Sequence, residues 1–466
     1  MLLKYVYDEH LAQASYFVGC PGGGVALVID PARNIDPYLR LQDETGLKII
    51  GVAETHIHAD FASGGRELAA STGAILYISG HGEDDLAYDF TTAGVNVRTV
   101  CDGDTIMVGD VELAVIHTPG HTPEHIIFQI TDTGAHEPMG LFTGDALFAG
   151  DIGRPDLLDA TGNAVGSSDG AARQQYENVQ RFKQMPDYLQ VWPGHGAGSA
   201  CGKALGAVPS TTIGYEKRYN PAFQQPNAEA FVEWLLEGQP EPPHYFAQMK
   251  RVNRVGAALL DTLDTPEVLG EETLLAAVTE IRALVIDARS TDRFAQHHAH
   301  GTLNIPGTSR QFNTWAGWFV DYAAPTYLIA DENDAGRLIG LLRAIGVDEI
   351  PGYFPAEIVE QYDAQLETVE PSEAFVQAQN GAVILDVRGK TERQEERIPD
   401  SLFMPMGEVA NRLDELPRLQ DIIVQCGSGV RSGIIASLLE NYGFRVRNLA
   451  GGIEGWKRAG LPVENG

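Results

Sequence analysis

Eight consecutive residues constrain this chain more than any other segment: Glu54-Thr55-His56-Ile57-His58-Ala59-Asp60-Phe61. They follow the apolar run 48–53, which is typical of a strand that ends where the histidines begin. Two imidazoles and a carboxylate in one short loop suit iron, zinc or manganese. A polar loop with coincidental histidines is the alternative interpretation, so partners elsewhere in the chain must decide between the two.

Three later segments repeat the arrangement of an apolar run that ends in His or Asp. The run 111–116 leads into Thr118-Pro119-Gly120-His121, the run 140–144 leads to Asp145, and the run 189–194 leads to His195. Loops at strand ends, positioned by a rigid sheet, are where binding and catalytic sites are built. The repetition predicts one metal site assembled from several strand ends.

Taken in order, His-x-His-x-Asp, Thr-Pro-Gly-His, Gly-Asp and Pro-Gly-His resemble the metallo-β-lactamase fold. The resemblance covers roughly the first half of the chain and implies an αββα sandwich. The segment 238–243, Gly-Gln-Pro-Glu-Pro-Pro, breaks the chain and predicts a domain edge. We therefore expect a first domain over residues 1–245.

Length and composition narrow the class of protein. A chain of 466 residues is too long for one hydrophobic core, so two or three domains are expected. The net charge of −31 argues against nucleic acid and against anionic membranes as partners. The N-terminus lacks the apolar core of a signal peptide, and no apolar run approaches the ~18 residues that span a bilayer.

The four cysteines are scattered and form no Cys-x-x-Cys pair. A disulfide scaffold is not expected at this size, and reduced thiols indicate a cytoplasmic protein. Cys20 and Cys101 are interpreted as structural.

The second half of the chain contains an internal repeat. Residues 284–289, Leu-Val-Ile-Asp-Ala-Arg, are echoed by 383–388, Val-Ile-Leu-Asp-Val-Arg, and each copy continues into a further apolar strand, 327–331 or 422–426. Strands that alternate with helices imply small α/β domains with parallel sheets. We expect one domain over 246–367 and another over 368–466.

Both copies resemble rhodanese domains. The second copy carries the closer match in its Asp-Val-Arg segment at 386–388, in Cys426-Gly-Ser-Gly-Val-Arg431 and in the segment 451–456. Aligning the strands places Asp331 of the first copy at the position of Cys426, and Gly336 at the position of Arg431. The first copy is therefore predicted to be an inactive structural domain.

The loop that begins at Cys426 has the features of an anion site. A thiolate is the nucleophilic form of cysteine, and glycines let the backbone N–H groups converge in front of a helix N-terminus. With the positive charge of Arg431, this loop should stabilise a Cys426 thiolate and hold the terminal sulfur of a persulfide. The loop is one residue shorter than that of protein tyrosine phosphatases, which favours sulfur over phosphate. An inert buried cysteine is the alternative. The predicted substrate-binding residues are Gly427, Ser428, Gly429 and Val430.

Two interpretations of the metal loop stay open. In hydrolases such as glyoxalase II, His-x-His-x-Asp-His binds two metals, but Phe61 stands here at the last position and cannot ligate. A dinuclear zinc thioester hydrolase is weakened rather than excluded, because His58, Asp60 and His195 remain for a second metal.

The resemblance to persulfide dioxygenases implies instead a single Fe(II), bound by His56, His121 and Asp145. Two histidines and one carboxylate leave three positions open for O₂ and the substrate sulfur, as non-haem iron oxygenases require. Under this interpretation the remaining polar residues of the loops orient ligands and bound water. These residues are His58, Asp60 and His195.

Further residues have predicted roles near this site. Arg154 lies in a segment that resembles the dioxygenase family after its metal Asp, which implies a contact with the carboxylate of a thiol carrier. Cys201 either carries a sulfur atom near the iron or is a small filler in a Gly-rich turn. The segment 216–221 resembles the closing segment of the family, and its charges are predicted to be solvated. His81, His117 and His125 are interpreted as structural.

The whole chain resembles fusions of a persulfide dioxygenase with an inactive and an active rhodanese. The implied partners are a low-molecular-weight thiol persulfide, O₂, sulfite and thiosulfate. The thiol carrier (glutathione, coenzyme A or bacillithiol) and a homo-oligomeric state stay open. A third alternative is a non-catalytic sulfur carrier or redox sensor that displays Cys426.

Overall fold

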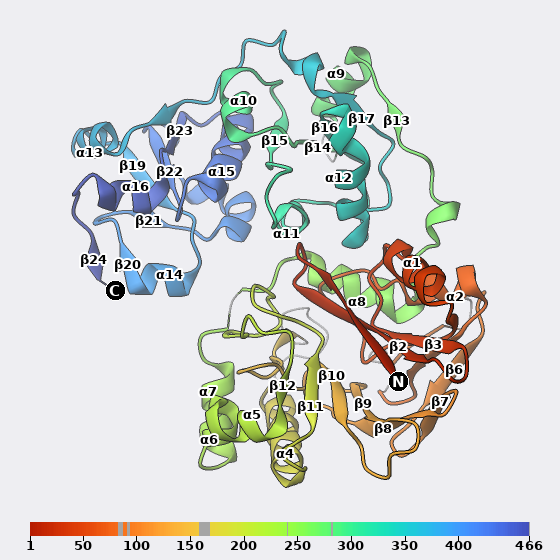
Figure 1. Cartoon of the computed structure of the whole chain (residues 1–466). Coiled ribbons are helices and arrows are strands. Elements are labelled where there is room, and N and C mark those ends of the chain that lie inside the picture. The colour runs from red at the N-terminus through yellow and green to blue at the C-terminus, as the bar shows by residue number, and fades with distance from the viewer. Residues whose placement is uncertain (83–86, 91–93, 158–167, 240, 281–282, 466) are drawn as a thin grey trace. The chain divides into compact units, whose positions relative to one another are not determined.

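The computed structural model describes residues 1–82, 87–90, 94–157, 168–239, 241–280 and 283–465. The chain forms two compact units, shown in Figure 1. The first unit comprises Met1–Leu263 with Arg343–Gly346, and the second comprises Asp264–Leu342 with Val347–Gly466.

The first unit contains a six-stranded sheet in the order β1-β2-β3-β4-β5-β6. Its strands are β1 (Leu2–Asp8), β2 (Gln13–Cys20), β3 (Val25–Ile29), β4 (Lys48–Ala53), β5 (Ile75–Ser79) and β6 (Val97–Val100). Strands β1 to β3 are antiparallel, and β3 to β6 run parallel. Because β4 ends at Ala53, the predicted metal loop starts directly at a strand end.

A second six-stranded sheet has the order β12-β11-β10-β9-β8-β7. Its strands are β7 (Thr105–Val108), β8 (Val111–His117), β9 (Ile126–Thr131), β10 (Gly140–Gly144), β11 (Gln190–Pro193) and β12 (Thr211–Thr212). All pairs are antiparallel except β10 with β11. Since these two strands run parallel, Asp145 and His195, which follow them, emerge at the same edge of the sheet.

The two sheets pack face to face through one apolar core. Tyr16 of β2 and Phe142 of β10 are both buried, and their ring centroids lie 5.0 Å apart. Burying a side chain such as Phe142 contributes about 1.5–3 kcal/mol relative to leaving it exposed. The alternating apolar positions of the strands thus face each other across the sandwich.

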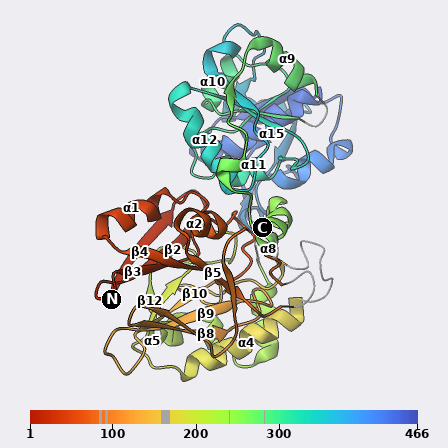
Figure 2. The ribbon, with the colours of Figure 1, turned by 90° about the vertical axis from the view of Figure 1, so that its right-hand side faces the viewer.

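Helices cover the outer faces of both sheets, as Figure 2 shows. The first sheet carries α1 (Asp36–Thr45) and α2 (Gly65–Thr72), and the second carries α4 (Ser168–Gln184), α5 (Ile213–Tyr219), α6 (Pro221–Gln224) and α7 (Ala228–Leu236). Glycines end α1 and α2 in the left-handed region, at Gly46 and Gly73. The predicted αββα sandwich is confirmed.

Helix α8 (Tyr245–Val255) lies beyond the predicted domain edge but belongs to the first unit. The Oη of Tyr245 donates to the carbonyl oxygen of Asp60 at 3.0 Å, and Asn253 Nδ2 donates to the carbonyl oxygen of His58 at 2.8 Å. The first unit therefore extends past residue 245, because the metal loop is held by this helix. Pro240 of the predicted break lies outside the described residues.

The second unit contains two five-stranded parallel sheets, in the orders β13-β17-β16-β14-β15 and β18-β23-β22-β19-β21. The first consists of β13 (Glu267–Val268), β14 (Leu284–Asp287), β15 (Thr302–Asn304), β16 (Thr326–Ala330) and β17 (Gly352–Pro355). The second consists of β18 (Thr368–Val369), β19 (Val383–Asp386), β21 (Leu402–Phe403), β22 (Ile422–Gln425) and β23 (Val446–Leu449). Strand for strand the two orders agree, so the predicted repeat with parallel sheets is confirmed.

Helices connect these parallel strands, as parallel pairing requires. In the first copy they are α9 (Glu271–Thr279), α10 (Thr291–Gln296), α11 (Phe312–Gly317) and α12 (Glu332–Ala344). In the second copy they are α13 (Pro371–Gln379), α14 (Lys390–Glu395), α15 (Val430–Asn441) and α16 (Gly452–Arg458). The short helices are η2 (Leu260–Thr262), η3 (Ala356–Val359), η4 (Met406–Asn411) and η5 (Leu413–Glu415), and β20 (Glu396–Arg397) pairs with β24 (Glu464–Asn465).

The strand register corrects the predicted alignment of the two copies. Asp386 lies opposite Gln425 in the second copy, and Asp287 lies opposite Ile329 in the first. Cys426 therefore corresponds to Ala330, and the alignment with Asp331 is wrong by one residue.

The lengths of the following loops also differ. Helix α12 begins at Glu332, immediately after Asp331, whereas three residues separate Cys426 from the start of α15. Counted from these helix starts, Gly336 is the fifth residue of α12 and Arg431 the second of α15, so their alignment is wrong as well. Ala330 is no nucleophile either, which leaves the first copy without a counterpart of Cys426.

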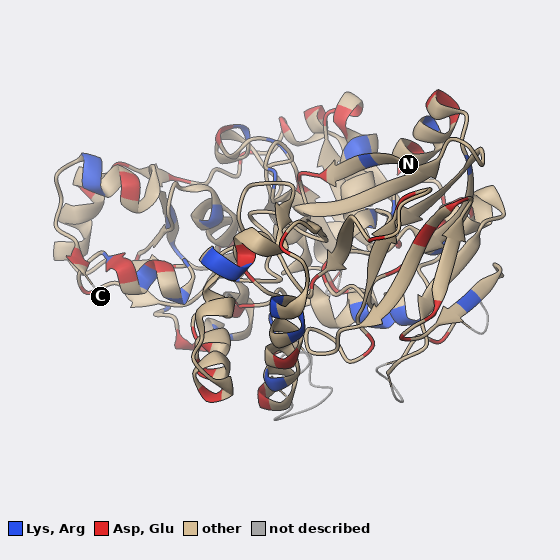
Figure 3. Cartoon of the chain, turned by 60° about the horizontal axis from the view of Figure 1, so that its bottom comes forward, with Lys and Arg blue, Asp and Glu red and all other residues tan. Residues whose placement is uncertain are grey.

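The acidic composition is visible along both units. Figure 3 shows Asp and Glu on helices, strands and loops, with Lys and Arg between them. Within the described ranges, none of the helices is both long enough and apolar enough to cross a membrane.

Candidate functional site

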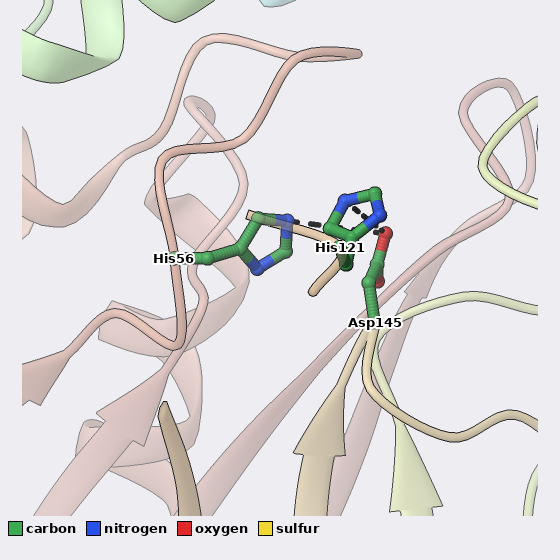
Figure 4. A group of neighbouring side chains, drawn as sticks. All are labelled: His56, His121 and Asp145. Atoms are coloured by element: carbon green, nitrogen blue, oxygen red, sulfur yellow. Dashed lines mark ion pairs between the residues drawn. The ribbon is translucent and has the colours of Figure 1, made fainter. Parts of the chain in front are cut away.

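Three buried side chains from three strand ends converge in the first unit, as Figure 4 shows. His56 follows β4, His121 lies between β8 and β9, and Asp145 follows β10. One donor atom of each lies within 4.8 Å of those of the other two. Asp145 Oδ2 is 3.8 Å from His56 Nε2 and 3.5 Å from His121 Nε2. The strand ends thus bring together the three residues predicted as iron ligands.

The donor atoms of this trio fit a metal ion. Among the described residues, His56 Nε2 and Asp145 Oδ2 have no hydrogen-bond partner. Buried polar atoms without partners are costly, and a cation between them would remove that cost. His121 Nδ1 lies 2.8 Å from the carbonyl oxygen of Arg154. The other ring nitrogen, Nε2, therefore faces Asp145 and is the atom available to bind a metal. Burial lowers the pKa of both histidines, so the imidazoles are neutral, as metal ligation requires.

His195 holds the carboxylate of Asp145 in place. Its Nδ1 lies 2.8 Å from Asp145 Oδ1, and its Nε2 lies 2.7 Å from Asp60 Oδ2. Burial acts to raise the pKa of Asp145, but His195 outweighs it and the pKa falls below its usual range. Burial acts to lower the pKa of His195, and the two carboxylates raise it well above its ordinary value. A charged imidazole therefore bridges the carboxylates of Asp145 and Asp60 beside the trio.

His58 is separated from Asp60 and His195, with which the sequence analysis grouped it. Its Nε2 lies 3.3 Å from Asp30 Oδ1 and 3.4 Å from Glu54 Oε2. Burial acts to lower the pKa of His58, but these two carboxylates raise it to about 10. His58 is thus a protonated histidine bound to two carboxylates, although its ring centroid lies only 4.2 Å from that of His56. Phe61 packs on the ring of His58 at a centroid distance of 4.4 Å.

Cys201 joins Asp60 and His195 in a second group of potential metal ligands. One donor atom from each residue lies within 4.8 Å of the others, and all three side chains are buried. Burial, together with Asp60 and Asp145, raises the pKa of the Cys201 thiol well above its ordinary value. The Cys201 thiol therefore favours its neutral form unless a metal ion binds beside it. The structure places it at the site, and its chemical role stays a prediction.

His125 has a structural role beside the trio. Its Nε2 accepts a hydrogen bond from the backbone N–H of Asp145 at 3.0 Å, and its Nδ1 lies 2.9 Å from Thr118 Oγ1. The ring stacks on that of His56 at a centroid distance of 4.8 Å. Gly144 adopts a φ of +47°, and a Cβ there would come within 2.6 Å of Thr55 Oγ1. This packing fixes the turn from which Asp145 projects.

Two charged residues have environments that differ from those expected. The guanidinium of Arg154 is buried and binds Asp156 through Nε at 2.8 Å and Nη2 at 2.6 Å. A contact with a carrier carboxylate would require this pair to open, so that role stays a prediction.

Glu216 is buried rather than solvated. Its Oε2 accepts from the N–H of Gly150 at 2.9 Å, and its Oε1 accepts from Thr211 Oγ1 at 2.7 Å.

Lys250 of α8 was missed by the sequence analysis. The residue is 8% exposed, and its Nζ has no hydrogen-bond partner within the described part of the chain. Burial lowers the pKa of Lys250 to about 8, while Glu124, Cys201 and Asp156 act to raise it. The spacing of Phe246, Met249 and Asn253 places residue 250 on the buried face of a helix, which was the available signal.

The Cys426 loop forms the second candidate site. The thiol is buried, and Gly429 N–H donates to Cys426 Sγ at 3.1 Å. Ser432 Oγ donates to the same sulfur at 3.4 Å. Gly429 has a φ of +102°, a conformation that favours glycine. The loop thus directs backbone and hydroxyl donors at the sulfur in front of α15, as an anion site requires.

Arg431 is engaged by a carboxylate in the same domain. Its Nη1 and Nη2 each lie 2.7 Å from an oxygen of Glu392 in α14. Glu392 thus shares the charge that was predicted for the sulfur site. Helix α16 closes the loop from the other side, since Ile453 N–H donates to the Cys426 carbonyl oxygen at 2.8 Å. A Cβ at Gly452 would come within 2.3 Å of that oxygen, so glycine is required there.

Known proteins resemble both parts of the chain. The family model of the metallo-beta-lactamase superfamily matches residues 9–195, and that of the rhodanese-like domain matches residues 372–459. The solved structure of a metallo-beta-lactamase from Staphylococcus aureus subsp. aureus COL is 43% identical, with a TM-score of 0.68. The similarity covers 76% of this chain and 99% of that chain.

Curated relatives match the first part. A hydroxyacylglutathione hydrolase from Rhodospirillum rubrum is 32% identical over 181 residues, which are 39% of this chain and 60% of the hydrolase. An uncharacterized protein from Mycobacterium leprae is 31% identical over 229 residues, which are 45% of this chain and 92% of that protein. The chain thus spans less than two thirds of the length of the hydrolase that it matches.

Proposed function

Since the chain belongs to the metallo-β-lactamase superfamily and carries a rhodanese-like domain, we propose that it is a persulfide dioxygenase joined to a sulfurtransferase. The first reaction is RSSH + O₂ + H₂O → RSH + H₂SO₃, with a low-molecular-weight thiol as RSH. The second moves a sulfane sulfur through a persulfide on Cys426 and forms or uses thiosulfate. The middle rhodanese-like copy would have no transfer activity.

The observation that carries this proposal is the composition of the metal trio. His58 is directed toward Asp30 and Glu54, which leaves two histidines and one carboxylate around a common point. Such a set, with open positions left on the metal, is typical of a single Fe(II) in non-haem iron oxygenases. When bound, Fe(II) would supply the sites at which O₂ and the substrate sulfur meet.

The residues around the trio maintain its geometry. His195 fixes the orientation of Asp145, and His125 fixes its backbone. The carbonyl oxygen of Arg154 fixes the His121 ring, so that each ligand is held by a second contact. Because the three ligands are buried, the surrounding protein excludes bulk water from the reacting atoms.

The Cys426 loop supports the second reaction. Gly429 N–H and Ser432 Oγ donate to the sulfur, so a thiolate or a persulfide anion would find donors already in place. In the transfer step, the Cys426 thiolate attacks the outer sulfur of thiosulfate, the S–S bond breaks, and sulfite leaves with its electron pair. Because one chain carries both sites, sulfite from the first reaction is produced at a raised local concentration near the second.

Metal analysis with oxygen uptake tests the proposal. Protein purified without oxygen should contain one iron per chain and consume one O₂ for each sulfite formed from glutathione persulfide. Two zinc ions per chain with thioester hydrolysis and no oxygen uptake would overturn it.

The second candidate function is a dinuclear zinc thioester hydrolase, and one observation favours it. Cys201 lies with Asp60 and His195, and its thiolate would supply the third donor that Phe61 cannot. A curated relative of the first part is named hydroxyacylglutathione hydrolase. Metal analysis of zinc-loaded protein distinguishes this function from the dioxygenase. If the protein is a dinuclear hydrolase, Cys201→Ser should lower the zinc content from two ions per chain to one. Under the dioxygenase function the iron content stays at one per chain in the variant.

A further inference from the structure

Lys250 is a buried cation for which the described residues provide no hydrogen-bond partner. Only 8% of the residue is exposed, and Nζ has no hydrogen-bond partner among the residues that the structure describes. Lysine is almost never buried unless it is paired, because an ammonium taken out of water loses its hydration. An unpaired ammonium in this position calls for a ligand of opposite charge.

The position of Lys250 relates it to the metal loop. It lies on the buried face of α8, between Tyr245 and Asn253. These two residues donate hydrogen bonds to the carbonyl oxygens of Asp60 and His58. The helix is therefore fixed against the loop that carries His56, and Lys250 is part of the same face.

The charges that act on Lys250 belong to the surroundings of the metal trio. Burial lowers the pKa of Lys250, and the carboxylate of Glu124 acts to raise it. Glu124 also accepts the N–H of Ile57, so the carboxylate that acts on Lys250 is bound to the metal loop itself.

The neighbouring carboxylates are occupied by other groups. Glu124 Oε1 accepts from the N–H of Ile57 at 2.7 Å and from Thr122 Oγ1 at 2.8 Å. Asp156 is paired with Arg154 at 2.6 Å. Arg154 is thereby neutralised, whereas Lys250, on the helix that binds the metal loop, has no hydrogen-bond partner in the described part of the chain.

A persulfide substrate brings a negative charge into an acidic site. The carboxylates of Asp30, Glu54, Asp60 and Asp145 outnumber the two charged imidazoles that pair with them, those of His58 and His195, and the excess of like charge repels an incoming anion. We propose that Lys250 binds the anionic sulfur of the persulfide and so determines that the site accepts an anion. This inference rests on the dioxygenase function proposed above and names the residue that recognises its substrate. Because the charge belongs to the persulfide group, the contact is common to persulfides of different thiols.

Steady-state kinetics of the iron-loaded full-length protein test the contact. Lys250→Met should raise KM for glutathione persulfide and for the persulfide of 2-mercaptoethanol by the same factor, about tenfold or more. Lys250→Arg keeps the charge and should restore most of the affinity. Arg251→Met is the matched control, since this exposed neighbour on α8 loses the same charge outside the site. An increase confined to glutathione persulfide would overturn the proposal in favour of a carboxylate contact.

Binding to the metal-free protein gives a readout that needs no turnover. Calorimetry with sulfite, in a Cys426→Ser background, should show binding about tenfold weaker for Lys250→Met than for Lys250 or Lys250→Arg. Equal affinity of folded Lys250→Met and its parent would overturn the proposal. The thermal midpoint of Lys250→Met should be unchanged or higher, because the variant removes an unpaired buried charge.

The two experiments separate this inference from the function on which it rests. Weaker sulfite binding by Lys250→Met, in a protein that consumes no O₂ with any persulfide, would leave the anion site standing and overturn the dioxygenase. Normal dioxygenase activity of Lys250→Met with an unchanged KM would overturn the anion site and leave the dioxygenase function standing.

Discussion

In the first unit, His56, His121 and Asp145 reach the candidate metal centre from three separate strand ends, whereas Cys426 and Arg431 lie in one continuous segment of the second unit. Every donor of the metal centre is a side chain. The sulfur of Cys426 instead receives a backbone N–H from Gly429 and faces a helix N-terminus. Removing one ligand side chain should therefore abolish metal binding. In the Cys426 loop, the loss of sulfur transfer should depend on which group is removed, because the backbone donors remain.

The largest effect is expected when a ligand of the metal centre is removed. In His121→Ala, iron content and oxygen uptake should fall below detection, because two remaining donors hold a metal far more weakly. Sulfur transfer from thiosulfate to cyanide should stay at the level of the unmodified protein. Elemental analysis and an oxygen electrode measure the first effect, and His136→Ala, which removes an exposed histidine, is the control. Retention of stoichiometric iron by His121→Ala would show that the trio is not the ligand set.

Removal of the loop nucleophile should separate the two activities. Cys426→Ser should lower transfer from thiosulfate to cyanide by roughly 10³-fold, since the sulfur that accepts the transferred atom is lost. Oxygen uptake with glutathione persulfide should continue, and sulfite should accumulate in place of thiosulfate. Cys101→Ser removes an exposed cysteine and should behave as the parent protein. Thiosulfate formation at the normal rate in Cys426→Ser would contradict the division of labour between the sites.

Arg431→Ala tests whether the loop loses activity in steps. Transfer should fall by about tenfold, because one charge-assisted contact is lost while the Gly429 N–H remains. The unpaired Glu392 would add repulsion of the anion, and Arg431→Ala with Glu392→Gln should recover part of the loss. Arg445→Ala removes an exposed arginine of the same domain as a control. A loss as large as that of Cys426→Ser would show that the backbone donors alone do not support transfer.

The smallest effect is expected at the position where a second metal would need a nitrogen. Phe61→His should change oxygen uptake by less than about threefold, because Phe61 packs on His58 and lies outside the trio. Iron should remain at one per chain. A strong loss of activity with an unchanged circular dichroism spectrum would show that Phe61 shapes the site itself.

Strand ends that carry His or Asp could be predicted because each is a local pattern of an apolar run and a turn. The direction of His58 could not, because it depends on Asp30 at the end of β3 and on Glu54. Both lie near His58 in space, but spacing in the sequence does not reveal which way an imidazole turns. The same limit applies to Cys201, whose neighbours Asp60 and His195 come from other loops.

Two errors of position have a similar origin. The Pro-rich segment 238–243 is typical of a domain edge, yet α8 beyond it contributes Tyr245, Asn253 and Lys250 to the first unit. Aligning the apolar strands of the two copies in the sequence places Asp331 at the position of Cys426. Pairing in the sheet shows that Ala330 matches Cys426, because register is determined by neighbouring strands and not by the strand itself.

The two copies also differ in the charges at the start of corresponding helices. Helix α12 begins with Glu332 and Asp334 in its first turn, where carboxylates interact favourably with the helix dipole, by about 0.3–1 kcal/mol each. Helix α15 has no acidic residue in its first turn and carries Arg431 there, so the dipole interaction is unfavourable. The ion pair between Arg431 and Glu392 is partly exposed, so it offsets little of the unfavourable interaction with the helix dipole. The first copy thus has the more stable helix start, and the second has the weaker one, whose positive first turn is what the proposed anion site at Cys426 requires.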